Sequence, residues 1–253
     1  LQATTTPPPP TTTSASPCAE GRARRLRELK RLGTVVGVGD RTARRLHEDG
    51  HTLETLLRGD AQSEEPDYLT ETQRLGLRYY RDLQTRIPRD EIRRWESRLQ
   101  AHLGRAHPSL RGVVCGSYRR GLATSGDVDV LFTSDTWRAP SDAATGLRAL
   151  LSDEFFHSTL VAHMTNPLRV RSKYMGFARL HDGGLVRRID VRAVPKDAFV
   201  AALLYFTGDA AENLRLRSRA RALGMTLNEY GLTASSTATD GGGDALPLRD
   251  EEH

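Results

Sequence analysis

Two carboxylates stand two residues apart at the start of an apolar segment. Asp127 and Asp129 lie in the stretch GDVDVLF. Because alternate residues of a strand point to the same face, a strand here would bring the two side chains together. Like charges at that distance raise each other's pKa, and burying them without a cation is costly. The pair therefore predicts a Mg²⁺ site, the alternative being two solvated acids at a strand end.

A basic turn flanked by glycines precedes these acids. The motif GSYRRG runs from Gly116 to Gly121 and follows a short apolar segment. Backbone N–H groups, Ser117 and Arg120 could together surround a phosphate, and Gly126 would permit close backbone approach. Alone, the motif also fits an exposed basic turn. Next to the paired acids, it predicts a phosphate site beside a metal site.

A third carboxylate occurs in the alternating segment RRIDVR. Asp190 has Arg188 and Arg192 two residues to either side, and all three would share one face of a strand. The flanking cations favour an ionised carboxylate. A third acid would complete a two-metal site, whereas the alternative is a surface strand of ion pairs.

The fourth feature is a glycine-rich turn near the N-terminal side. Gly37 and Gly39 stand in GVG, directly before a helix expected from about Asp40. A turn that leads into a helix presents free N–H donors to a phosphate. With a helix expected on each side, the pattern fits a helix-hairpin-helix that holds a nucleic-acid backbone without reading its sequence.

The elements that position these residues define an α+β chain. Residues 1–20 form a Thr/Pro-rich tail, expected to be disordered, and residues 21–106 are expected to be helical. Alternating apolar patterns predict a mixed sheet with helices over 107–195, including strands at 155–163, 168–180 and 185–194. Residues 196–253 are expected to form a small C-terminal α/β subdomain. The first residue is not Met, which suggests a fragment or a processed form.

Composition narrows the class of protein further. The chain has 253 residues, of which 38% are hydrophobic, and a formal net charge of +5. That apolar fraction excludes full disorder, no segment is long and apolar enough for a membrane helix, and two cysteines exclude a disulfide scaffold. The charge is uneven, because residues 21–31 net +5 and residues 240–253 net −4. The eight histidines show no metal-ligand spacing along the sequence.

Several motifs in one order resemble the family X DNA polymerases, most strongly its beta-type members. They are GSYRRG, TSGDVDVLF, RRIDVR and LLYFTG, supported by RIPRDEI, PKDAF and TLNEYG. The resemblance implies a nucleotidyltransferase palm after the helix-hairpin-helix region, then a nucleotide-selecting subdomain. It also implies template-directed gap filling in base excision repair, with nucleotidyl transfer from a dNTP to a primer 3′-hydroxyl.

The resemblance assigns roles to individual residues. Asp127 and Asp129 would bind two Mg²⁺ ions, with Mn²⁺ as an alternative, and Asp190 would bind the catalytic ion and accept the hydroxyl proton. Contacts to the dNTP would come from Arg86, Ser117, Arg120, Gly126, Tyr205, Phe206, Gly208 and Asn213. DNA contacts would come from Gly37, Gly39, Arg188 and Arg217. Carbonyls of Gly33, Val35 and Val38 would hold a monovalent cation, and Glu229 would support a closed state.

The expected partners are gapped or nicked duplex DNA and dNTP, and no membrane is expected. The enzyme is expected to be a monomer in the nucleus, with a mitochondrial role as the alternative.

Three departures from the family pattern stand out: the Thr/Pro tail replaces an N-terminal lyase domain, the C-terminus is short, and Ala210 stands where the family often has Asp. Two other functions remain open, a non-catalytic fragment that binds DNA ends or gaps and a template-independent nucleotidyltransferase. The pair Tyr205-Phe206 resembles template-dependent enzymes.

Overall fold

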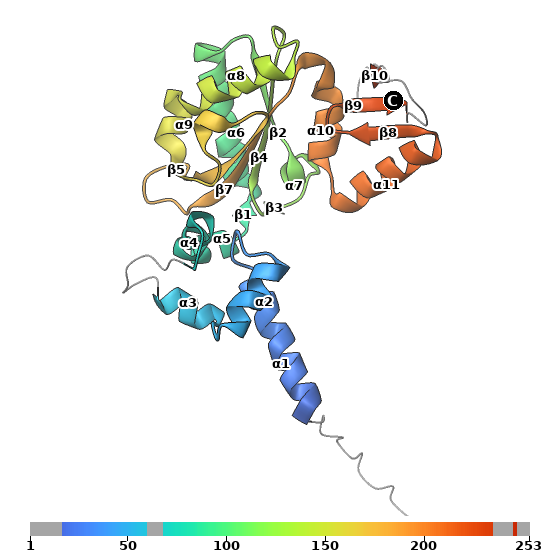
Figure 1. Cartoon of the computed structure of the whole chain (residues 1–253). Helices are drawn as coiled ribbons and strands as arrows, with labels where there is room; N and C mark the ends of the chain where they lie inside the picture. Colours follow the sequence, from blue (N-terminus) through green and yellow to red (C-terminus); the bar gives the residue numbers. More distant parts are fainter. Residues whose placement is uncertain (1–16, 60–67, 235–244, 247–253) are drawn as a thin grey trace, which may run out of the picture. The chain divides into compact units, whose positions relative to one another are not determined.

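The computed structural model describes residues 17–59, 68–234 and 245–246. By its contacts the chain divides into two compact units, residues 1–78 and residues 79–253 (Figure 1). The first helix begins at Pro17, so residues 17–20 of the expected tail belong to a helix. Residues 1–16 of that tail lie outside the described residues.

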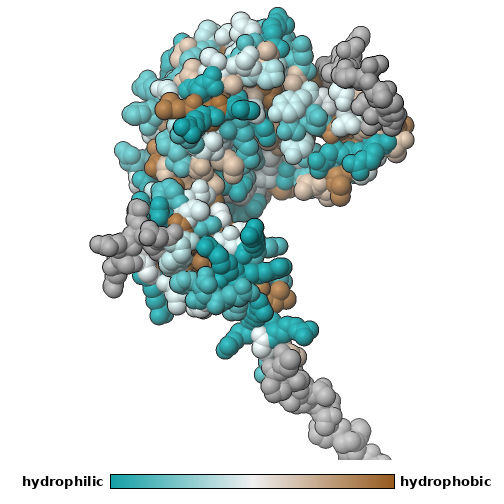
Figure 2. Space-filling view, viewed as in Figure 1, coloured by the Kyte–Doolittle hydropathy of each residue, from teal (hydrophilic) through white to brown (hydrophobic). Residues whose placement is uncertain are grey.

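The first unit is helical in its described part. Its helices are α1 (Pro17–Leu32), α2 (Asp40–Glu48), α3 (Leu53–Gly59) and α4 (Glu71–Arg78). Apolar side chains from all four helices and from the turn at 33–39 are buried; they include Leu32, Val35, Val38, Leu46, Leu56 and Leu75. On the face shown in Figure 2, the region of α1 and α2 is mostly hydrophilic, with a small hydrophobic patch, as expected for short helices whose main apolar stripe faces a core.

The turn between α1 and α2 depends on two glycines. Gly37 has φ +86°, a left-handed conformation that favours glycine, and a Cβ there would lie 2.9 Å from Cγ2 of Thr72. A Cβ on Gly76 would lie 2.4 Å from the carbonyl oxygen of Val36. Since α4 can approach the turn only where no side chain intervenes, both glycines hold the turn against α4.

The second unit contains all the described strands. Its helices are α5 (Tyr80–Gln84), α6 (Arg89–Ala106), α7 (Gly116–Arg119), α8 (Pro140–Leu151), α9 (Glu154–Thr159), α10 (Phe199–Thr207) and α11 (Ala210–Ala222), with 3-10 turns at Pro167–Arg169 and Lys196–Ala198. Its strands are β1 (Ile87–Pro88), β2 (Leu110–Val114), β3 (Thr124–Ser125), β4 (Val128–Ser134), β5 (Leu160–His163), β6 (Lys173–Ala178), β7 (Arg187–Ala193), β8 (Met225–Asn228), β9 (Gly231–Ala234) and β10 (Ala245–Leu246).

The central sheet is mixed, as the sequence predicts. Its strand order is β2-β4-β7-β6-β5, in which β4 and β7 are parallel and the other neighbours antiparallel. A small ribbon pairs β1 with β3, and a second sheet has the order β10-β9-β8. This second sheet lies beside α10 and α11 at one side of the central sheet (Figure 1).

Alternation along the strands separates two layers. Val128, Val130 and Phe132 of β4 join a core with α6, α8 and α9. Leu131, between two of them, instead joins Phe199 and other residues of α10 in a second cluster. Because Asp127 and Asp129 share parity with Leu131, the carboxylates point away from the larger core.

Several segments differ from the sequence prediction, and the strand expected at 168–180 is confined to β6, because Pro167–Arg169 form a 3-10 turn. Residues 155–159 belong to α9 rather than to a strand, and Phe155 and Phe156 are buried in the larger core. An apolar run this short does not distinguish a buried helix from a strand. Helix α6 lies within the helical region expected over residues 21–106. It buries Trp95, Leu99 and Leu103 in that same core. By its contacts the chain divides after Arg78, so α6 belongs to the second unit.

Among the described residues, no helix is long and apolar enough to cross a lipid bilayer.

Candidate active site

Parallel pairing of β4 with β7 assembles the three predicted carboxylates. Asp129 and Asp190 are directly opposite each other in the register of the two strands. Carboxylate oxygens of Asp127, Asp129 and Asp190 all lie within 4.8 Å of one another. Residues 61 positions apart in the chain thus contribute to a single cluster, as a two-metal site requires.

Burial raises the pKa of one carboxylate in this cluster. Desolvation first, and the neighbouring charge of Asp190 second, raise the pKa of Asp129 to about 6, against the opposing effects of Arg120 and Lys173. Oδ1 of Asp190 is buried and has no hydrogen-bond partner among the described residues. A buried carboxylate oxygen without a donor is destabilising unless a cation approaches it. These hard oxygen ligands fit Mg²⁺ or Mn²⁺.

Arg188 offsets part of the carboxylate charge. Its Nη2 contacts Oδ2 of Asp127, and its Nε lies 3.7 Å from Oδ1 of Asp190. The expected primer contact therefore lies within the acid cluster itself. This position follows from the two-residue period of β7, which places Arg188 and Asp190 on one face.

The predicted phosphate turn is a short helix against Asp129. Residues Gly116–Arg119 form α7, where the sequence predicts only a turn. The backbone N–H of Cys115 donates to the carbonyl of Asp129 at 2.9 Å, so the turn is anchored to β4. Ser117 is half-buried beside this anchor, and Arg120 extends from the end of α7.

Arg120 connects the turn with the YFTG segment. Its Nη1 donates to the carbonyl of Thr207 at 2.5 Å, next to Gly208 at the end of α10. Arg86 is placed separately: its Nε and Nη2 donate to the side chain and carbonyl of Thr124, at 2.9 and 2.8 Å. This leaves Arg86 beside Gly126, whose missing Cβ would be 3.5 Å from Nη1 of Arg86.

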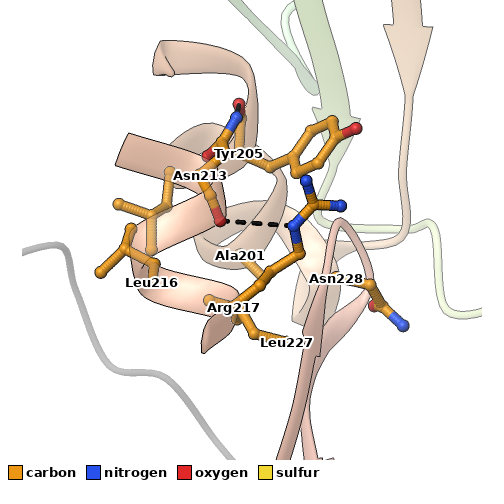
Figure 3. Close-up of a pocket in the computed structure, with 8 residues that line it drawn as sticks. Ala201, Tyr205, Asn213, Leu216, Arg217, Leu227 and Asn228 are labelled. Carbon is orange, nitrogen blue, oxygen red and sulfur yellow. Dashed lines mark hydrogen bonds between the residues drawn. The ribbon is translucent and has the colours of Figure 1, made fainter. Parts of the chain in front are cut away.

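Tyr205, Phe206, Asn213 and Arg217 form one group around α10 and α11. The two aromatic rings meet edge to face with centroids 5.3 Å apart, and Nδ2 of Asn213 donates to the carbonyl of Tyr205 at 2.8 Å. Arg217 lies over the Tyr205 ring and donates to the carbonyl of Asn213 at 3.3 Å. Figure 3 shows Tyr205, Asn213 and Arg217 lining one pocket with residues of β8.

Glu229 lies close to Arg192, a residue of β7, the strand that also contains Asp190. Arg192 of β7 places Nη1 3.8 Å from Oε1 of Glu229 and its guanidinium 5.0 Å from the Phe206 ring centre. Arg192 therefore links β7, the strand that carries Asp190, to Phe206 and Glu229. The sequence predicts Arg192 only as a neighbour of Asp190, because alternation along β7 cannot reveal the partners of Arg192 on other elements.

A supporting network for the phosphate turn is absent from the sequence prediction. The Tyr118 hydroxyl donates to Oε2 of Glu96 at 2.6 Å, and Arg89 donates to the carbonyls of Tyr118 and Leu122 at 2.8 and 3.2 Å. The Arg89 guanidinium also lies 4.3 Å from the Tyr118 ring centre. Burial first, and the Glu96 carboxylate second, raise the pKa of Tyr118. No local sequence signal identifies this network, because Arg89 and Glu96 belong to α6 and are far from Tyr118 in the sequence.

The remaining predicted residues lie in the first unit. Val35 and Val38 are buried in the turn between α1 and α2, while Gly33, Gly37 and Gly39 are exposed. Nε2 of Gln73 donates to the carbonyl of Gly37 at 3.0 Å, and Val38 N donates to the carbonyl of Val35 at 3.0 Å. The turn is thus held from within this unit, with three exposed glycines on its surface.

A mixed sheet with this carboxylate triad beside a glycine-bounded turn defines the nucleotidyltransferase class of palm domains. Comparisons with known proteins agree with that class. Residues 86–196 match the family model for the DNA polymerase beta palm, residues 202–253 that for the DNA polymerase beta thumb, and residues 30–84 that for the fingers domain of DNA polymerase lambda. The chain belongs to the family X DNA polymerases.

Similar full-length proteins are DNA polymerases lambda. The chain is 34% identical to the enzyme of Rattus norvegicus over 231 residues, which is 88% of this chain and 39% of that protein. It is also 34% identical to the enzyme of Arabidopsis thaliana over 222 residues, 86% of this chain and 41% of that protein. The chain thus spans about two fifths of the length of these relatives.

Proposed function

We propose that the chain is the catalytic part of a template-directed DNA polymerase that fills short gaps during DNA repair. It would transfer a nucleotidyl group from a dNTP to a primer 3′-hydroxyl. The observation that carries the proposal is the triad itself, in which Asp129 and Asp190 face each other across paired strands and Oδ1 of Asp190 is buried without a donor.

Asp127, Asp129 and Asp190 would hold two divalent ions, Mg²⁺ or Mn²⁺. When bound, such ions supply Lewis-acid stabilisation of the attacking oxygen and of the phosphate charge. Asp190 would take the proton of the primer hydroxyl, a role suited to a carboxylate oxygen without a competing donor. Arg188, already within the acid cluster, would turn toward the primer end.

The basic side chains would bind and orient the triphosphate. Ser117 and Arg120 would contact phosphate oxygens, together with Arg86 beside Gly126. Charge-assisted hydrogen bonds of this kind are stronger than neutral ones and fix orientation. Tyr205, Phe206 and Gly208 would pack against sugar and base, Asn213 would reach the nascent pair, and Arg217 would contact the template.

The first unit would grip the DNA backbone as a helix-hairpin-helix. Gly37 and Gly39 would let the backbone approach a phosphate at the start of α2, and carbonyls of Gly33, Val35 and Val38 would hold a monovalent cation. Such contacts are independent of sequence and weaken with salt. We further propose a monomer that acts on gapped or nicked DNA in the nucleus.

The test is single-nucleotide incorporation on gapped DNA by the intact chain and by Asp190→Ala. The proposal expects Mg²⁺-dependent, template-matched incorporation that Asp190→Ala abolishes while gapped DNA still binds. Undiminished incorporation by the variant would overturn the catalytic assignment. Binding without incorporation by the unmodified chain would favour a non-catalytic fragment, and addition without a template would favour a terminal transferase.

A further inference from the structure

A second cluster of residues that could ligate a metal ion lies outside the acid triad. It consists of His102 near the end of α6, His107 at the C-cap of α6, and Asp153 at the N-cap of α9. Both helices pack on the larger core, whereas Asp127 and Asp129 point away from that core. This cluster is therefore separate from the candidate active site.

The three side chains converge on one point. Nε2 of His102 lies 2.7 Å from Oδ1 of Asp153, and Nε2 of His107 contacts Oδ2 of the same carboxylate. The ligand atoms of all three residues lie within 4.8 Å of one another. His107 has left the helix, with φ −141° and ψ 61°, and so its ring can face that of His102 five residues earlier.

Hydrogen bonding within the cluster leaves one buried nitrogen unsatisfied. His102 is only 9% exposed, yet its Nε2 has no hydrogen bond of acceptable geometry among the described residues. Oδ1 of Asp153 already accepts from the backbone N–H of Phe155 at 3.0 Å. Nε2 of His102 therefore shares Oδ1 with that amide at 2.7 Å, and no other acceptor reaches it among the described residues. An unsatisfied buried nitrogen of this kind is costly.

We propose that His102, His107 and Asp153 bind a borderline divalent cation, with Zn²⁺ the best match. Two imidazole nitrogens and one carboxylate oxygen are ligands that Zn²⁺ accepts, and with these three protein ligands the fourth position of a tetrahedral ion would be taken by water. The amide of Phe155 orients the carboxylate, as an outer hydrogen bond commonly does at metal sites. The ion would fasten the end of α6 to the start of α9 and stabilise the palm.

The experiment measures Zn²⁺ binding in a background that lacks the acid triad. The chain carrying Asp127→Asn, Asp129→Asn and Asp190→Asn is stripped with a chelator and titrated with Zn²⁺, with Mg²⁺ as a parallel probe. The expected result is a rise in Tm of roughly 5–10 °C when free Zn²⁺ exceeds Kd about a hundredfold. Mg²⁺ at the same concentration should leave Tm unchanged.

Single histidine variants in that background locate the site. His102→Gln and His107→Gln should each weaken Zn²⁺ binding at least tenfold, whereas His157→Gln, an exposed histidine of α9, should not. Co²⁺ should give an intense visible spectrum that His107→Gln removes. Because His107 is half-exposed, its variant remains informative if His102→Gln fails to fold. Equal Zn²⁺ affinity in His107→Gln and in the parent, or no Zn²⁺ binding to the folded parent, would overturn the proposal.

Discussion

A side-chain carbon on Gly116 would lie 2.1 Å from Oδ2 of Asp129. This distance is far shorter than any non-bonded contact between a carbon and an oxygen. Gly116 also has φ +60°, a left-handed conformation that favours glycine. The predicted phosphate turn and the carboxylate of Asp129 can therefore occupy adjacent positions only because residue 116 has no side chain. The glycine couples the two halves of the candidate site.

Gly116→Ala should lower kcat for single-nucleotide incorporation by at least about a hundredfold, because small displacements of catalytic groups cost on that order. The matched control is Gly121→Ala, since Gly121 has φ +83° but no atom within 4 Å of the missing Cβ. Both positions have a positive φ, so both variants introduce backbone strain, and only Gly116→Ala should move Asp129. Equal losses in the two variants would mean that strain alone is responsible.

Arg120→Ala should raise the KM for dNTP on the order of 10- to 100-fold, because it removes a charge-assisted phosphate contact worth about 1.5–3 kcal/mol. Steady-state incorporation on gapped DNA measures this effect. Arg138→Ala removes the same charge from an exposed position and controls for the change in net charge. A KM for dNTP that Arg120→Ala leaves unaltered would exclude Arg120 from the triphosphate site.

Arg187 forms a buried ion pair at the start of β7, the strand that contains Asp190. It is 3% exposed and donates to both carboxylate oxygens of Glu91, at 2.8 and 2.7 Å. Arg187→Met should lower the free energy of unfolding by about 3–5 kcal/mol, because Glu91 keeps a largely buried charge without its partner. Urea unfolding measures the loss.

The exposed pair of Arg93 with Asp90 supplies the comparison for this ion pair. Arg93→Ala should change the free energy of unfolding by no more than about 0.5 kcal/mol, as is usual for exposed pairs. A double-mutant cycle with Glu91→Gln should recover much of the loss caused by Arg187→Met. If the losses of unfolding free energy in Glu91→Gln and in Arg187→Met simply add in the double variant, the two side chains are not energetically coupled.

Tyr174 makes stability sensitive to alkaline pH. It is fully buried, its hydroxyl lies 2.7 Å from Nδ1 of His163, and burial raises its pKa. Below about pH 10, tyrosine is protonated in the folded and unfolded states alike. Above that pH the unfolded state loses the proton first and the folded state retains it. Stability should therefore fall as pH rises.

Tyr174→Phe tests this sign directly. Urea unfolding at pH 9 and pH 11 should show a smaller loss of stability in the variant than in the unmodified chain. Tyr230→Phe, at an exposed position, should leave the pH dependence unchanged. An identical pH slope in Tyr174→Phe would mean that other groups cause the alkaline loss.

The sequence alone determined which residues are the candidates for the chemistry. The spacing of Asp127 and Asp129, the segment around Asp190 and the glycine-bounded turn follow from periods of two residues and from local turn preferences. These are short-range properties, and so the α+β class, the strands β4 and β7 and the family could all be predicted. The strand expected at 155–163 was wrong over its first half, because local apolarity does not distinguish a buried helix from a strand.

Only the tertiary structure decided which of these residues meet. Parallel pairing sets Asp129 opposite Asp190, and packing of α7 against β4 makes Gly116 indispensable beside Asp129. His102 and Asp153 are 51 positions apart and show no metal spacing in the sequence, yet α6 and α9 bring them within 2.7 Å. Such contacts depend on strand register and helix packing across long sequence separations, which local patterns do not encode.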